Sequence, residues 1–114
     1  MGNEIQQFYK DFTRYGQKLA KESPDMSKSI KALHDGVMKK GVLTRKEKEF
    51  ISIGIAIAAH CPPCIRLHTQ SAVAAGASKE EIIEAASVAC VLAGGIAYTH
   101  IPEVMKTLEA MGVA

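Results

Sequence analysis

Two helices and the turn between them are encoded in residues 44–76, which read TRKEKEFISIGIAIAAHCPPCIRLHTQSAVAAG. Thr44 and Glu47 form the pattern of a capping box, in which each side chain bonds the backbone of the other residue at a helix start. The run from Phe50 to Ala59 is apolar on every side, so this helix should be buried, in part by another subunit. The second helix should begin after Cys61 and end at Gly76.

The turn between these helices carries a pair of cysteines and a histidine. Cys61 stands at an N-cap-like position, and proline is tolerated in the following first turn because amides there have no intrahelical partner. A helix N-terminus stabilises a thiolate over a thiol, and His68 can reach Cys64 from one turn away and accept its proton. Cys61 is close enough in sequence to form a disulfide with Cys64. This pattern predicts thiol redox chemistry.

Glu49 is a single acid at the edge of the apolar run, and its spacing from His68 is informative. It lies roughly 15 Å before the end of the first helix, and His68 lies roughly 10 Å into the second, at 1.5 Å per residue. If the helices pack as an antiparallel hairpin, the two side chains come approximately abreast. A carboxylate there would orient the imidazole, as the third group of a triad does. We therefore predict a proton relay from Cys64 through His68 to Glu49.

The first forty residues contain two amphipathic patterns. Apolar side chains recur at spacings of three and four, which predicts two helices separated near Ser23 and Pro24. The apolar positions are Ile5, Phe8, Phe12, Tyr15 and Leu19, followed by Met26, Ile30, Leu33 and Val37. These aromatic side chains can pack on a neighbouring subunit as readily as on the core of their own chain.

The remaining residues predict further helices and no strand. A second capping box, residues 78–81, opens a mostly apolar helix over residues 82–92. Gly94 and Gly95 should break or tightly pack it, and Pro102 should stand near the start of a last helix, residues 103–111. No stretch alternates with a period of two. Residues 1–114 are thus expected to form a single all-α domain, a bundle of about six helices that assembles into a homo-oligomer.

Composition narrows the class of protein further. The formal charge is +2 and the basic residues are dispersed, which does not favour a nucleic-acid partner. The apolar stretches are too short to span a bilayer, and no secretory signal is visible at the start. Three cysteines without such a signal favour a reducing compartment, where a close pair is more often catalytic than structural. We therefore expect a soluble cytoplasmic protein.

The spacing Glu49, eleven residues, Cys61-x-x-Cys64-x-x-x-His68 resembles the motif of the AhpD-like alkylhydroperoxidases, which belong to the carboxymuconolactone decarboxylase superfamily. The resemblance covers about residues 44–111. It implies an all-α fold that assembles as trimers or hexamers and reduces a hydroperoxide or disulfide substrate. It also implies that Cys64 is the activated thiol, Cys61 the resolving one, His68 the base and Glu49 the group that orients it.

The resemblance further implies which partners the protein uses. Reductants in this family include dihydrolipoyl proteins, and a peroxiredoxin is a second candidate redox partner. The chemistry demands no cofactor, and we expect no metal and no membrane partner. The decarboxylase branch of the superfamily generally lacks the cysteine pair, so the pair favours the redox branch.

Two alternatives remain open at the level of sequence. Cys61, Cys64 and His68 are candidate zinc ligands, which would make the protein a zinc-bound module, and a cysteine pair can also serve as a redox sensor without catalysis. In a lyase of the decarboxylase type, His68 and Glu49 would transfer protons and the cysteines would be incidental. The sequence identifies no partner for His34, His60 or His100, although His60 directly precedes Cys61 and could influence that thiol. Cys90 is most simply a small buried apolar residue of its helix.

Overall fold

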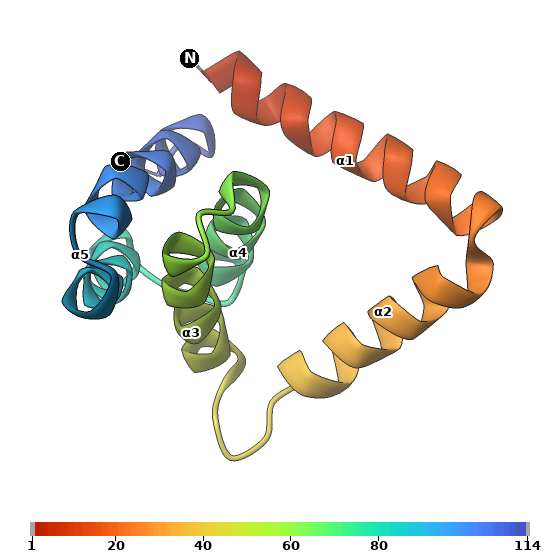
Figure 1. The fold of residues 1–114 in the computed structure, drawn as a ribbon, viewed down its shortest axis with the longest axis horizontal. Coiled ribbons are helices and arrows are strands. Elements are labelled where there is room, and N and C mark those ends of the chain that lie inside the picture. Colours follow the sequence, from red (N-terminus) through yellow and green to blue (C-terminus); the bar gives the residue numbers. More distant parts are fainter. Residues whose placement is uncertain (1, 114) are drawn as a thin grey trace.

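The computed structural model describes residues 2–113 as an all-α fold (Figure 1). Within these residues five helices follow one another: α1 (Gly2–Glu22), α2 (Pro24–Met38), α3 (Arg45–Ala58), α4 (Pro62–Ala74) and α5 (Lys79–Ala110). The all-α prediction is confirmed. The expected number of about six helices is wrong, because the last two expected helices both lie within α5.

The helix boundaries follow the local sequence signals. Thr44 Oγ1 accepts a hydrogen bond from the Glu47 N–H, and the Glu47 carboxylate accepts one from the Thr44 N–H. Ser78 and Glu81 repeat this exchange at the start of α5, so both predicted capping boxes are confirmed. The backbone N–H bonds favour the charged carboxylates and lower the pKa of Glu47 and Glu81, the latter with help from Lys46.

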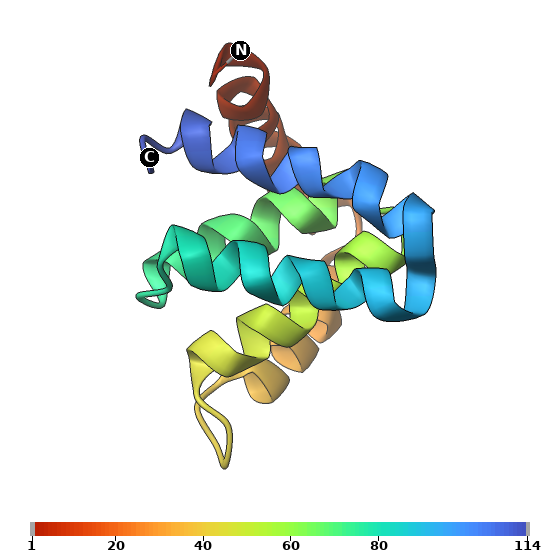
Figure 2. The ribbon, with the colours of Figure 1, turned by 90° about the vertical axis from the view of Figure 1, so that its left-hand side faces the viewer.

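α5 is interrupted at Gly94, whose φ of 63° and ψ of −142° are not helical. The chain turns back at this point, and the two limbs of α5 lead away from the turn in the same general direction (Figure 2). The second limb therefore carries Pro102 in its interior. The sequence-based prediction that Pro102 stands near the start of the last helix is wrong. Proline removes a hydrogen bond to the carbonyl of Tyr98, and both residues are exposed, so water can bond that carbonyl.

By length and composition, α5 is the one helix within residues 2–113 that could cross a membrane. The break at Gly94 divides it into residues 79–93 and 95–110, and each limb is shorter than the about 20 residues that span a bilayer. Side chains from both limbs also enter the hydrophobic core. Each limb therefore contributes one face to the core of this fold.

The hydrophobic core lies between α3, α4 and α5. Isoleucines from all three helices fill its centre, and alanines allow the helices to approach closely. Its buried members include Ile53 and Ile57 from α3, Ile65 and Ala72 from α4, and Ile82, Ala86, Ala97, Val104 and Leu108 from α5. Each large side chain buried there stabilises the fold by about 1.5–3 kcal/mol, so these helices form a firm base for the cysteine turn.

α1 and α2 form an arm that projects from this core and returns to it (Figure 1). The start of α1 is anchored by Ile5, which is buried, and the end of α2 by Lys48, whose Nζ donates to the carbonyls of Val37 and Lys39 at 2.7 Å. Between these anchors lies the apolar stripe of the arm, whose members are 44–63% exposed: Phe12, Tyr15, Leu19, Met26, Ile30, Leu33 and Val37. The predicted amphipathic pattern is present, but this chain does not cover it.

A second apolar surface lies between α3 and the first limb of α5. Ile51, Ile55, Val88 and Leu92 are exposed there and line an apolar groove of about 370 Å³ together with Phe50. The expectation that α3 is buried on every side is therefore not met within one chain. Its apolar face toward α4 and α5 is buried, and its other face is open.

Candidate functional site

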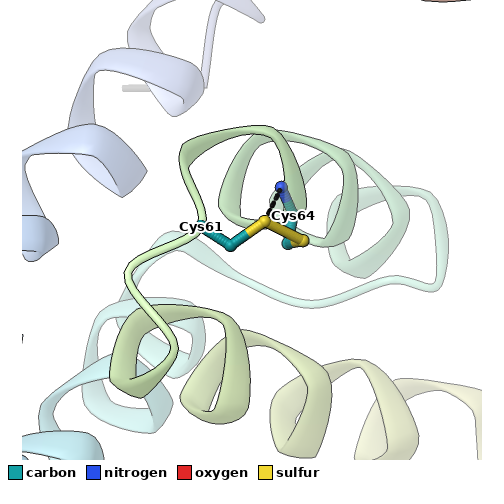
Figure 3. The surroundings of a disulfide bond; sticks show 2 residues. All are labelled: Cys61 and Cys64. Carbon is teal, nitrogen blue, oxygen red and sulfur yellow. Dashed lines mark hydrogen bonds between the residues drawn. A yellow bond between two sulfur atoms is a disulfide. The ribbon is translucent and has the colours of Figure 1, made fainter.

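The start of α4 holds the two cysteines, and it has the geometry expected from the sequence. Cys61 is the N-cap residue, Pro62 and Pro63 occupy the first turn, and the two sulfurs form a disulfide (Figure 3). The Cys64 N–H donates to Cys61 Sγ at 3.3 Å, so the first cysteine caps the helix with its sulfur. Both cysteines are partly exposed, which leaves the pair accessible to a small reactant.

Glu49 and His68 meet across the α3–α4 hairpin. Glu49 is completely buried, and its Oε1 lies 2.7 Å from Nδ1 of His68, whose side chain is 25% exposed. The predicted register of the two helices is thereby confirmed. The Glu49 carboxylate faces α4 and is excluded from water, although the residue lies near the start of its helix.

Arg45 completes this contact and was not predicted as a site residue. Its Nε donates to Oε2 of Glu49 at 2.8 Å, so each carboxylate oxygen accepts one charged or polar donor. Arg45 is 43% exposed and thus connects the buried acid to solvent. The spacing of four residues between Arg45 and Glu49 is a usual one for helix ion pairs, and it is the signal by which the sequence could have identified this residue.

The acid determines which nitrogen of His68 carries the proton. A carboxylate can only accept hydrogen bonds, so Nδ1 of His68 is the donor and Nε2 of the neutral ring is left to accept a proton. Cys64 lies one turn earlier on the same face of α4. The arrangement is therefore capable of removing a proton from a reduced Cys64 and holding it on an imidazole that a buried carboxylate orients.

Arg66, between Cys64 and His68 in sequence, ties this helix to its neighbours. Its Nε donates to Glu103 on α5, and its guanidinium lies over the ring of Phe8 on α1. The Tyr9 hydroxyl donates to the Arg66 carbonyl at 2.7 Å, and burial raises the pKa of Tyr9 to about 12 although the Arg66 charge opposes the shift. The helix of the site is thus held by both the arm and α5.

The other cysteine and histidines lie apart from this relay. Cys90 is a free thiol packed against the core, as expected for a small apolar residue, and His34 contacts Asp35 on the exposed arm. His60 and His100 stack on each other, with ring centroids 5.0 Å apart, a contact that the sequence did not reveal. Within residues 2–113 no three His, Cys, Asp or Glu side chains converge as metal ligands, so the zinc alternative gains no support from the geometry.

Comparison with known proteins identifies the class. Residues 24–110 match the profile of the carboxymuconolactone decarboxylase family, a match that begins in the arm and extends through both limbs of α5. The chain belongs to this family, within the AhpD-like superfamily. The resemblance drawn from the cysteine motif is therefore confirmed, and it extends about twenty residues further toward the N-terminus than the motif indicated.

Solved structures of two relatives share almost the whole architecture of this chain. A carboxymuconolactone decarboxylase family protein from Legionella pneumophila, crystallised in its apo form, is 31% identical with a TM-score of 0.89 over 94% of this chain and 96% of that one. A protein from Thermotoga maritima is 29% identical with a TM-score of 0.86 over 94% of each chain. In a second crystal structure the same protein is described as a carboxymuconolactone decarboxylase family protein with a candidate role in antioxidative response. Uncharacterised protein 4 in the cox locus of Paracoccus denitrificans is 35% identical over 78 residues, 68% of this chain and 70% of that protein.

Proposed function

We propose that this protein is a thiol oxidoreductase that reduces hydroperoxides through the Cys61–Cys64 pair. The observation that carries the proposal is the disulfide across the first turn of α4, one turn before an imidazole that a buried carboxylate orients at 2.7 Å. A helix N-terminus favours a thiolate, and a positioned base lowers the cost of forming it. The antioxidative role suggested for the Thermotoga maritima relative is consistent with this chemistry.

The reaction begins from the reduced pair. Nε2 of His68 accepts the Cys64 proton, directly or through one water, and the thiolate attacks the terminal oxygen of the hydroperoxide. The S–O bond forms, the O–O bond breaks, and the alcohol leaves after taking a proton, so that Cys64 becomes a sulfenic acid. Cys61 then attacks Cys64 Sγ, the S–O bond breaks, water leaves, and the disulfide closes.

The disulfide must be reopened by a dithiol. A reduced dithiol of the dihydrolipoyl class would attack one sulfur, form a mixed disulfide and leave as a cyclic disulfide, which restores both thiols. The partly exposed cysteines are open to such a reagent. A protein that carries a dihydrolipoyl group is therefore the electron donor that we propose, with a peroxiredoxin as the alternative redox partner.

The test is a single-turnover reaction of the reduced protein with tert-butyl hydroperoxide. We expect one equivalent of peroxide to be consumed and two thiols to disappear, with mass spectrometry locating the new bond between Cys61 and Cys64. Cys64→Ser should abolish the reaction, whereas Cys90→Ser is the matched control that should retain it. A Cys64→Ser variant that consumes peroxide at the rate of the parent would refute the proposal. Proton-transfer activity on a lactone acid that survives both Cys61→Ser and Cys64→Ser would instead favour the lyase alternative.

We also propose that the protein works as a homo-oligomer in which another copy covers the apolar stripe of the arm. The seven side chains of this stripe are about half exposed, and roughly 100 Å² from each gives about 700 Å², close to the about 800 Å² per partner of a standard protein interface. The apolar groove between α3 and α5 is a further uncovered surface on the same chain. Between its two anchored ends the arm presents this stripe to solvent, so covering the stripe would also hold the middle of the arm in place.

Sedimentation equilibrium tests this assembly directly. We expect the parent protein to associate and Leu33→Asp, in the middle of α2, to dissociate it, because a charge would be desolvated in the contact. Ala32→Asp, at an exposed position on the same helix outside the stripe, is the control for the added charge. A parent chain that sediments as a monomer at all concentrations would contradict the proposal, and so would a Leu33→Asp variant with unchanged mass.

A further inference from the structure

Three helices of this chain end in the same hydrogen-bonding arrangement. At the end of α4, the N–H of Gly76 bonds the Val73 carbonyl and the next N–H bonds the Ala72 carbonyl. At the end of α5, Gly112 and the residue after it bond the carbonyls of Glu109 and Leu108 in the same way. This is the Schellman motif, in which the residue after the C-cap takes a left-handed conformation and is usually glycine. Gly76 has a φ of 93° and Gly112 a φ of 75°.

At the end of α3 the same position is occupied by histidine. The His60 N–H bonds the Ile57 carbonyl at 3.1 Å, and the Cys61 N–H bonds the Ala56 carbonyl at 3.1 Å. His60 has a φ of 54° and is the one residue other than glycine with a positive φ within residues 2–113. The left-handed region is unfavourable for a side chain with a Cβ, and such strain is retained where the side chain serves another purpose. The two glycine caps show that this fold uses glycine at such positions elsewhere.

The ring of His60 is held in a defined place. It stacks on His100 with ring centroids 5.0 Å apart and planes 18° from parallel. His100 is itself anchored, because its Nδ1 donates to the Ile96 carbonyl at 2.9 Å just after the turn of α5. Neither imidazole forms an ion pair with an acid in the part of the chain that the structure describes. The strained cap therefore presents an anchored imidazole, that of His60, immediately before Cys61.

The relay through His68 assigns a base to Cys64 and leaves the proton of the Cys61 thiol without an assigned acceptor. His68 lies one turn after Cys64 on α4, and its Nδ1 is held by Glu49. Cys61 stands outside α4 as its N-cap, with His60 as its direct neighbour. We propose that His60, held by its stack on His100, is the proton-exchange group for Cys61. This proposal rests on the redox function proposed above for the pair.

The step in which His60 acts is the closing of the disulfide. The imidazole takes the proton of the Cys61 thiol, directly or through one water, and Cys61 Sγ attacks the sulfenic sulfur of Cys64. The S–S bond forms as the S–O bond breaks, and the departing hydroxide receives the proton to leave as water. Thiol and sulfenic acid are thereby converted into disulfide and water with no other oxidant or reductant. The titratable neighbours of His60 are His100 on α5, on which its ring stacks, and Cys61, the next residue in the chain.

Glycine and asparagine substitutions separate this role from a structural one. His60→Gly removes the ring and relieves the left-handed strain, so we expect a melting temperature equal to or above that of the parent. His60→Asn keeps a side chain that tolerates the left-handed region but cannot exchange a proton at neutral pH. In both variants we expect the reduced Cys61 to react with iodoacetamide at least about tenfold more slowly at pH 7, with its pH profile displaced upward. Cys64 alkylation should be unchanged.

Alkylation needs no peroxide, so this experiment is independent of the proposed peroxidase activity. If the protein fails to consume hydroperoxide while His60→Gly still slows Cys61 selectively, the peroxidase proposal fails and the role of His60 stands. His100→Ala, which removes the stacking partner, should slow Cys61 in the same direction by a smaller factor. Equal Cys61 rates and pH profiles in the parent, His60→Gly and His60→Asn proteins would overturn the inference. So would a His60→Gly protein that is slower only because it is less stable.

Discussion

The negative charge of Glu49 is expected to contribute more to reactivity than to stability. In the parent protein Arg45 Nε and His68 Nδ1 donate to separate carboxylate oxygens of Glu49, at 2.8 and 2.7 Å. Glu49→Gln keeps the shape of the side chain but offers these two donors only one oxygen. Arg45 is 43% exposed and can turn toward water, so the amide oxygen should stay with His68. We therefore expect the free energy of unfolding to fall by about 2 kcal/mol, the value of one hydrogen bond to a charged group.

The effect on reactivity follows from the charge that develops on His68. When His68 accepts the Cys64 proton, it becomes an imidazolium beside a buried carboxylate. Two unit charges about 4 Å apart attract by about 4 kcal/mol at an effective dielectric constant of about 20. Desolvation of the buried acid offsets part of this attraction, and a remainder of about 2–3 kcal/mol corresponds to roughly a hundredfold in rate.

Stopped-flow oxidation of the reduced protein by hydroperoxide at pH 7 measures this rate, and urea unfolding measures the stability of the same samples. Glu103→Gln is the matched control, because Glu103 is also a poorly exposed acid that pairs with an arginine but has no histidine partner. The control should lose comparable stability and little rate. A Glu49→Gln rate within about threefold of the parent, or equal slowing in both variants, would refute the reasoning.

Three further outcomes can be measured on purified protein. Burial raises the pKa of Tyr9 from 10.0 to about 12. The stability that depends on the protonated Tyr9 hydroxyl is therefore complete below pH 10 and is lost as the pH rises through about 12. Over that range the unfolding free energy of Tyr9→Phe should fall less steeply than that of the parent. The pKa of Glu81 is lowered from 4.5, so its contribution is present above that pH and is lost on acidification; Glu81→Gln should show a flatter decline in stability in acid unfolding curves. The Cys61–Cys64 disulfide closes a loop with a sequence separation of 3, for which the loss of chain entropy in the unfolded state stabilises the fold by about 2 kcal/mol. In urea unfolding with reductant, the protein should therefore remain folded in water, with its free energy of unfolding lowered by no more than that amount. Loss of the cooperative transition on reduction would contradict the last expectation.

The parts of the fold that were predictable from sequence depend on short-range chemistry. The capping boxes at Thr44 and Ser78 and the N-cap at Cys61 are each determined within four residues of the chain. The contact of Glu49 with His68 was also predictable, because the helical rise converts sequence spacing into distance once two helices are taken as an antiparallel hairpin.

The parts that were not predictable depend on the path of the chain in space. The contact of His60 with His100 arises only after α5 turns back at Gly94, and no spacing rule joins residues forty positions apart. Pro102 was predicted to stand near a helix start because proline lacks the N–H that a helix interior requires. Whether a helix tolerates proline in its interior depends on the surroundings of the residue four positions earlier, here the exposed Tyr98, which the sequence does not reveal. The apolar pattern of α3 indicated burial on every side, but a pattern does not identify which molecule supplies the contact.

Arg66 links the helix of the cysteine pair to the arm and to α5. It lies on α4 between Cys64 and His68, its carbonyl accepts the Tyr9 hydroxyl of the arm, and its guanidinium pairs with Glu103. If opening the disulfide alters the association constant of the arms by some factor, association must alter the equilibrium constant for reduction by the same factor, because coupling free energies are reciprocal. The redox equilibrium of this protein would then vary with its concentration, and dilution would act on the cysteine pair through the arm.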